Sequence, residues 1–244
     1  MTDSTIDDGE VRKFAAMAED WWDPRGKFRP LHAINPVRLE VIREHALAHF
    51  KRDGAVRRPF EGLKLLDIGC GGGLASEPMA RLGFEVTGID VIDRNLAIAR
   101  THAQQSGLAI DYRTSTAEAL AEAGEQYDVI LNLEVVEHVD NVPLYLKSCA
   151  ALLTPGGLLV SSTINRTARA LALAVIGAEY VLRWLPRGTH DWSKFLTPEE
   201  LTTLLRRNGL EVAEPTGVVY NPLADAWRQS RDTGVNYMLA ASKP

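Results

Sequence analysis

The sequence predicts an α/β protein with a mostly parallel sheet of seven strands and helices on both faces. Short apolar runs alternate with amphipathic segments from about residue 63 to 164, and several of these runs end in glycines or acidic residues. Parallel strands covered on both faces have this continuous apolar pattern. We expect one domain over residues 1–244, with an N-terminal helical cap at 10–60 and a helical insertion at 164–196 after the fifth strand.

The N-terminal part is predicted to be helical. Residues 10–22 carry apolar side chains at helical spacing, and Pro24, Gly26 and Pro30 then interrupt the pattern. Asn35 followed by Pro36 is typical of an N-cap with proline at the first helical position. A second helix is therefore predicted to begin at this pair.

The central part is predicted to alternate strands with helices. The predicted strands are 63–69, 84–90, 108–115, 127–134 and 158–164, and the helices between them are 73–83, 91–107, 116–124 and 142–157. Thr197 and Glu200 form a capping-box pattern that predicts a further helix. Two last strands are expected near 210–220 and 235–242.

Composition indicates a soluble globular protein. Of 244 residues, 45% are hydrophobic and 24% charged, and the formal net charge is -5, which disfavours a nucleic-acid partner. The two cysteines predict neither a disulfide framework nor a metal site. The polar N-terminus does not resemble a signal peptide, and no apolar run has the length that spans a bilayer. We therefore expect a reducing, cytoplasmic compartment.

The segment LLDIGCGGG, residues 65–73, is the most informative part of the sequence. Glycines after a strand let a ligand approach the backbone, so Gly69 and Gly71 are candidate ligand contacts. Asp90 ends the next strand, where an acidic residue suits ribose hydroxyls. Leu74 stands where a dinucleotide G-x-G-x-x-G site needs glycine, which disfavours a nicotinamide oxidoreductase. A tight turn without a ligand is the structural alternative.

The glycine loop reads D-x-G-x-G-x-G and is similar to the first motif of class I methyltransferases, which bind S-adenosylmethionine. YDVILNLEVVEHV and LTPGGLLVSS resemble two further motifs of these enzymes, so the resemblance implies their Rossmann-like fold. WWDPRGKFRPLHAINPVRL, LEVVEH and IGAEYVLRWLPRGTHDWSKFLTPEEL together resemble the ubiquinone biosynthesis O-methyltransferase family, from about residue 14 to 237.

This resemblance implies S-adenosylmethionine-dependent O-methylation of polyprenyl phenol and quinol substrates. Both O-methylation steps are implied, on a 2-polyprenyl-6-hydroxyphenol and on 3-demethylubiquinol. Carried over by position, Arg38 would meet the methionine carboxylate of the methyl donor, Asp90 its ribose, and Gly69, Gly71 and Leu133 would lie against it. Other interpretations are a class I methyltransferase for another small acceptor, or a non-catalytic cofactor-binding scaffold.

The segment LEVVEHVDN, residues 133–141, carries Glu134, Glu137 and His138. In a helix these positions would share one face, and they follow the fourth strand at the ligand-binding edge of the sheet. They could hold a divalent cation, magnesium or manganese, that binds both catechol oxygens. Alternatively, His138 acts as general base beside a carboxylate, or the three residues only form a charged helix start.

The insertion and the N-terminal aromatic residues are expected to serve an apolar substrate. Residues 166–187 combine a wide apolar face with Arg166, Arg169, Arg183 and Arg187, which suits peripheral contact with membrane lipid. A lid or a packed core helix is the alternative, and a membrane-bound biosynthetic complex is a further expected partner. Trp21, Trp22 and Phe28 are candidates for a wall of the acceptor pocket. His32 and His190 are candidates to line the site, and His45, His49 and His102 are predicted to be surface residues.

Overall fold

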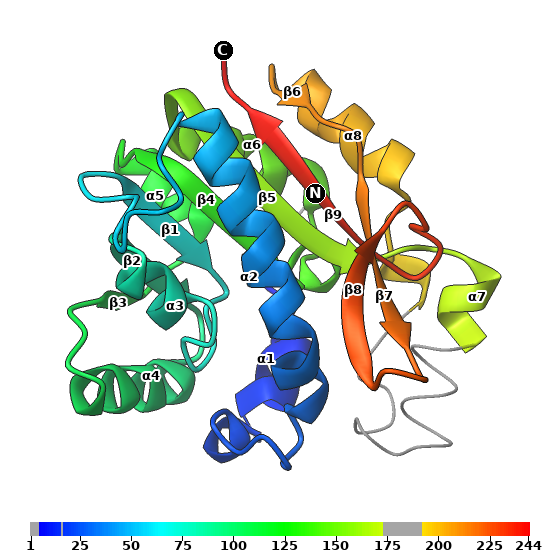
Figure 1. Cartoon of the computed structure of the whole chain (residues 1–244), viewed down its shortest axis with the longest axis horizontal. Helices are drawn as coiled ribbons and strands as arrows, with labels where there is room; N and C mark the ends of the chain where they lie inside the picture. Colours follow the sequence, from blue (N-terminus) through cyan, green and yellow to red (C-terminus); the bar gives the residue numbers. More distant parts are fainter. Residues whose placement is uncertain (1–4, 16, 173–191) are drawn as a thin grey trace.

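The computed structural model describes residues 5–15, 17–172 and 192–244, and its centre is a β-sheet (Figure 1). The described part of the chain contributes nine strands, in the order β3-β2-β1-β4-β5-β9-β7-β8, with β6 paired to β9. The first five strands are mutually parallel. They are β1 Lys64–Ile68, β2 Glu85–Asp90, β3 Asp111–Thr114, β4 Tyr127–Leu133 and β5 Leu153–Ile164.

The remaining strands are antiparallel to their neighbours. They are β6 Glu211–Val212, β7 Thr216–Asn221, β8 Ala226–Ser230 and β9 Asn236–Ser242, and β9 lies between β5 and β7. The expected α/β architecture with a mostly parallel central sheet is confirmed, and two details enlarge it. The predicted strand 210–220 is divided at Pro215, which has no N–H for a ladder. β8 forms a hairpin with β7 that the prediction did not include.

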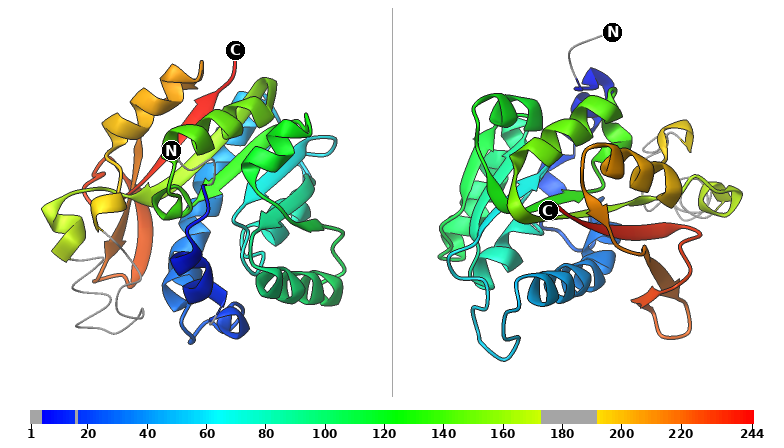
Figure 2. Two further views of the ribbon diagram at one scale, coloured as in Figure 1. Left: turned by 180° about the vertical axis from the view of Figure 1, so that it is seen from behind. Right: turned by 90° about the horizontal axis from the view of Figure 1, so that it is seen from above.

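Alternating side chains along each strand supply two hydrophobic layers. In β4, Ile130 points into a core with α5 Ala117–Glu122, α6 Val142–Leu152 and α8 Pro198–Arg207. Its neighbours Val129 and Leu131 point into the opposite core, with α2 Arg29–His49 and α3 Ser76–Arg81. This is the two-residue period of a strand. Viewed from above, α6 and α8 lie on one side of the sheet and α2 on the other (Figure 2).

The N-terminal segment precedes the sheet and reaches its ligand-binding edge. It contains α1 Asp8–Ala15, the 3-10 turn η1 Ala18–Asp20, and α2. The predicted start of the second helix was wrong, because α2 begins at Arg29 and includes Pro36. Pro30 already occupies an early helical position, and the Asn35 side chain donates to the carbonyl of Leu74 instead of capping the helix. That bond ties α2 to the end of the glycine loop.

The helix α4 Asp93–Gln105 packs on β2 and β3, and short turns complete the connections. These turns are η2 Val136–His138, α7 Ala168–Ala170 and η4 Trp192–Lys194. Most of the proposed membrane segment, including Arg183 and Arg187, lies outside the described residues, and so does the site candidate His190. Within the described part, Arg166 pairs with Glu200 and Arg169 with Asp232. No helix among the described residues combines the length and apolar character needed to cross a bilayer.

Candidate active site

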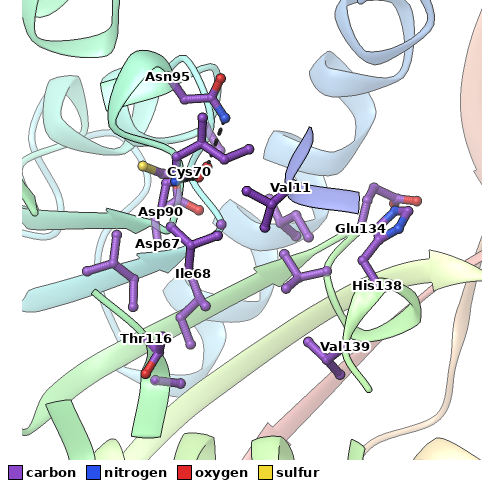
Figure 3. A pocket seen from close by; sticks show the side chains of 18 of the residues that line it. Val11, Asp67, Ile68, Cys70, Asp90, Asn95, Thr116, Glu134, His138 and Val139 are labelled. Atoms are coloured by element: carbon purple, nitrogen blue, oxygen red, sulfur yellow. Dashed lines mark hydrogen bonds between the residues drawn. The ribbon is translucent and has the colours of Figure 1, made fainter. Parts of the chain in front are cut away.

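A cavity of about 260 Å³ opens at the carboxyl ends of β1, β2 and β4. Parallel strands bring the loops that follow them to this same edge, which is where open α/β sheets bind ligands. Figure 3 shows Asp67, Asp90 and Asn95 toward one end of the cavity and Glu134 and His138 toward the other. Of the residues predicted to contact the methyl donor, the four that line it are Arg38, Gly69, Asp90 and Leu133.

The glycine loop turns through left-handed backbone conformations that favour glycine. Gly69 has φ +65° and Gly71 has φ +54°. A Cβ atom on Gly71 would lie 2.3 Å from the ring of Trp21, and one on Gly69 would lie 2.6 Å from Val135. Trp21 therefore covers Gly71. In this structure Gly71 contacts the N-terminal segment, where a contact with the methyl donor was predicted. The loop is shaped for close approach by neighbouring groups.

Asp90 is held at the end of β2 by a set of backbone and side-chain donors. Its Oδ2 accepts from the Gly71 N–H at 2.9 Å and from Asn95 Nδ2 at 3.3 Å, and its Oδ1 accepts from the Ile92 N–H at 2.8 Å. Burial raises the pKa of Asp90, and the bond from Ile92 opposes that rise. The Asp90 carboxylate is thus fixed beside the cavity, where its oxygens can accept hydrogen bonds from the hydroxyl groups of a ligand.

Asp67 and Arg38 are two further buried polar residues that line the cavity. Ser76 Oγ donates to Asp67 Oδ2 at 2.5 Å, and burial raises the pKa of Asp67 to about 6. The Arg38 guanidinium donates from Nη2 to Asn35 Oδ1 at 3.1 Å. Burial lowers the pKa of Arg38, and the negative charge of Glu134 opposes that change.

Arg38 retains unused donor capacity beside the cavity. The residue is 4% exposed, and its buried Nε has no hydrogen-bond partner among the described residues. A guanidinium pairs well with a carboxylate because two N–H groups can face two oxygens. The residues present therefore fit an amino-acid ligand carrying a ribose, with Arg38 toward its carboxylate and Asp90 toward its hydroxyls.

Glu134 and His138 lie at the other end of the cavity (Figure 3). Glu134 leaves β4 with φ +55°, an uncommon conformation for a residue other than glycine. Its side chain accepts from Ser162 Oγ, and its Oε1 lies 3.6 Å from Arg38 Nη1. The short turn η2 then places His138 among the lining residues. A fixed carboxylate and an imidazole thus face the same space.

Glu137 does not join them, which corrects the predicted helical face. The turn is 3-10, and it follows a left-handed residue, so Glu134, Glu137 and His138 do not have the spacing of one α-helical face. Glu137 is 3% exposed and is absent from the cavity lining. Burial and the nearby Glu134 raise its pKa well above the ordinary value, which favours the protonated acid.

A three-residue metal site is consequently not supported. Among the described residues, no group of three or more His, Cys, Asp or Glu side chains converges as metal ligands would. Both Oε atoms of Glu137 are buried without a hydrogen-bond partner in the described part of the chain. The Glu137 carboxyl group therefore lacks hydrogen bonds within the described part of the chain. It is not among the residues that line the cavity with Glu134 and His138.

The cavity walls are largely apolar and come partly from the N-terminal segment. Trp21 and Phe28 line it as expected, stacked with ring centroids 3.8 Å apart. Trp22 and His32 lie outside the lining. Several stretches of the lining were not predicted from the sequence, among them residues 5–7 and the residues that follow β3. For the residues after β3, their place after a parallel strand was the available sign, since the third strand ends at the same edge as the first two. The residues after β3 are Ser115, Thr116, Ala117 and Glu118.

The fold and this site define a class I methyltransferase. A family model described as "Methyltransferase domain" matches residues 40–214. The ubiquinone biosynthesis O-methyltransferase of Chelativorans sp. (strain BNC1) is 59% identical over 241 residues, covering 99% of this chain and 95% of that protein. The protein of the same name from Ruegeria pomeroyi is 59% identical over 242 residues, covering 99% and 98%. The chain belongs to the family of ubiquinone biosynthesis O-methyltransferases.

Solved structures share the fold at lower identity. The magnesium protoporphyrin IX methyltransferase from Synechocystis PCC 6803 with bound SAM is 18% identical, with a TM-score of 0.63 and 100% of each chain covered. A possible histamine N-methyltransferase from Thermotoga maritima is 17% identical, with a TM-score of 0.62 and coverage of 96% and 100%. These likenesses confirm the predicted fold class.

Proposed function

We propose that the protein moves the methyl group of S-adenosylmethionine to a phenol oxygen of polyprenylated catechols. Both O-methylation steps are included, on a 2-polyprenyl-6-hydroxyphenol and on 3-demethylubiquinol. The names of relatives 59% identical over nearly the whole chain support this assignment. The main structural support is that one cavity combines three features. Asp67 and Asp90 lie beside the glycine loop at one end, Glu134 and His138 lie at the other end, and apolar walls lie between them.

Arg38 and Asp90 bind and orient the methyl donor. The guanidinium of Arg38 pairs with the carboxylate of the donor's amino-acid part, and Asp90 accepts hydrogen bonds from its ribose. Gly69 and Leu133 lie against it without specific chemistry of their own. When bound, the donor supplies an electrophilic methyl group on a positively charged sulfur. Arg38 and Asp90 orient the donor so that its methyl group points toward the end of the cavity with Glu134 and His138.

His138 prepares the acceptor. A phenol has a pKa of about 10, so at neutral pH it is a poor nucleophile until its proton is taken. We assign that proton to the imidazole of His138. Arg38 and Ser162 fix Glu134. We assign to its carboxylate the role of stabilising the charged imidazole at the same end of the cavity. The phenol oxygen then forms a bond to the methyl carbon, the carbon–sulfur bond breaks, and its electron pair stays on sulfur as a neutral thioether.

We also propose that the acceptor reaches the cavity from a membrane surface. A polyprenyl tail is apolar and partitions into lipid. The pattern of residues 166–187 supports peripheral contact, with Arg183 and Arg187 as its basic residues. A biosynthetic complex on the same surface would shorten the path of the substrate between enzymes.

The test is methyl transfer from labelled S-adenosylmethionine to a short-chain prenylated catechol, with and without a chelator and with magnesium restored. Transfer that is indifferent to the chelator supports His138 as general base. Transfer that disappears and returns with magnesium would replace that role with cation binding at this end of the cavity. Binding of S-adenosylmethionine without transfer to any prenylated catechol would overturn the acceptor and leave the methyltransferase fold.

A further inference from the structure

Trp22 ties the N-terminal segment to the glycine loop from outside the cavity. Its Nε1 donates to the carbonyl of Gly72 at 2.9 Å. Its ring stacks on the imidazole of His102, with centroids 3.4 Å apart and planes 6° apart. His32 of α2 meets the same ring edge-on at 6.4 Å, and its Nε2 lies 2.9 Å from the carbonyl of Trp21. The tryptophan pair is thus held from two helices.

His102, which the sequence predicts to be a surface residue, is partly exposed and also contacts a buried partner. It lies on α4 with its side chain 31% exposed, and its Nδ1 is 2.5 Å from Oε1 of Glu77. Glu77 is fully buried, and its other oxygen accepts from Arg81 at 3.0 Å. A carboxylate can only accept, so the Nδ1 of His102 carries the hydrogen. This bond from α3 sets the plane of the imidazole on which Trp22 stacks.

The neighbouring tryptophan transmits this arrangement to the cavity. Trp21 covers Gly71 and Gly72 and lines the cavity. Its Nε1 donates to Asn95 Oδ1 at 2.9 Å, and Asn95 in turn donates to Asp90. Asn95 and His102 are seven residues apart on α4, two helical turns, and so lie on the same face. One face of α4 therefore contacts both tryptophans. Asn95 hydrogen-bonds to Trp21, and His102 stacks on Trp22.

We propose that His102, oriented by Glu77, is a positioning residue for methyl-donor binding. It holds Trp22 against the Gly72 carbonyl, so that Trp21 closes the glycine-loop side of the cavity over the donor. His102 does not line the cavity, and it acts through Trp22. The inference rests on the proposed use of S-adenosylmethionine.

The test measures S-adenosylhomocysteine binding by calorimetry and its dissociation by stopped flow. His102→Ala and Trp22→Ala should each raise the dissociation constant about 2- to 10-fold, the range of an aromatic stack, mainly through faster release. The double variant should be no weaker than the poorer single one, because both remove the same contact. His102→Phe keeps a stacking ring but loses the bond to Glu77, so it should restore only part of the affinity that His102→Ala loses. Thr101→Ala, at an exposed position on α4, is the matched control.

Steady-state kinetics separate positioning from a general loss of fold. In His102→Ala the KM for S-adenosylmethionine should rise while kcat at saturation stays within about twofold, since the reacting groups are intact. Equal affinity in wild type and His102→Ala, additive losses in the double variant, or no rescue by phenylalanine would each overturn the inference. Absence of binding in the wild type would instead overturn the proposed function.

Discussion

At the scale of single residues, the backbone at Glu134 decides which side chains meet. Its left-handed φ of +55° breaks the helical spacing that would have placed Glu134, Glu137 and His138 together. The sequence predicted the right edge of the sheet, because that follows from strand order. It could not predict the direction of each side chain, because no residue pattern announces a glutamate in this conformation. Glu137 consequently faces the core.

His138 should be needed for turnover but not for donor binding. Replacement by alanine is expected to lower kcat by about 10²- to 10⁴-fold, the usual contribution of a general base. The dissociation constant for S-adenosylhomocysteine should stay within about threefold, because His138 lies at the opposite end of the cavity from Asp90 (Figure 3). Single-turnover methyl transfer and calorimetry provide the two readings. A variant with kcat near that of the wild type would remove His138 from the chemistry.

Asp67 should make stability fall as the pH rises. Burial raises its pKa from 3.8 to about 6, so between these values the folded state binds more protons than the unfolded state. The free energy of unfolding therefore decreases with rising pH across this window, by an amount on the order of 2–3 kcal/mol, and the cost persists above pH 6. Urea unfolding of wild type and Asp67→Asn should diverge across the window, with the variant relatively more stable at pH 7.

The matched control for this effect is Asp53→Asn, at an exposed loop position. Its unfolding curve should track the wild type at each pH, because the Asp53 side chain is exposed and lies outside the buried site of Asp67. If Asp67→Asn and wild type show the same pH dependence, Asp67 does not titrate in this window.

At the scale of elements, the regular α/β part was predictable and the irregular parts were not. β1 to β5 and the helices between them follow from buried apolar runs, and Thr197 caps α8 with Glu200 reciprocally as expected. β8, with the sequence AWRQS, is only partly buried and has no apolar alternation. The early start of α2 depends on tertiary contacts, since Asn35 bonds to Leu74. Such contacts outweigh local capping preferences.

Gly71→Ala should weaken donor binding because the added Cβ atom would collide with Trp21, in addition to the strain of a left-handed backbone. A Cβ there meets the Trp21 ring at 2.3 Å, whereas a Cβ on Gly62, also at positive φ, meets nothing within 4 Å. Both alanine variants should lose about 1 kcal/mol of stability from the left-handed backbone. Gly71→Ala should also raise the dissociation constant for S-adenosylhomocysteine at least tenfold, and Gly62→Ala should leave it unchanged. Equal affinities would show that Trp21 moves freely.

At the scale of the whole molecule, the expected membrane contact can be tested by charge reversal. Vesicles containing phosphatidylglycerol should sediment the wild-type protein. Arg183→Glu with Arg187→Glu should lower the partition coefficient about tenfold or more, since each basic residue near an anionic surface contributes about 1 kcal/mol. Arg206→Glu with Arg207→Glu, on exposed positions of α8, is the control of equal charge. Equal losses of vesicle binding in both double variants would indicate nonspecific electrostatic attraction to the anionic lipid, without a defined membrane-binding surface on the protein.

The position of β9 inside the sheet has a consequence for how the chain folds. β5 pairs with β9 from Leu158–Ser242 to Ile164–Asn236, so the two paired strands are separated in the chain by residues 165–235. Closing so long a loop is slow, because its entropy is lost before the strand contacts are gained. Until then the apolar edge of β5 is an open template for another chain. Refolding yield should therefore drop as protein concentration rises, and translation has to deliver β9 before that edge is protected.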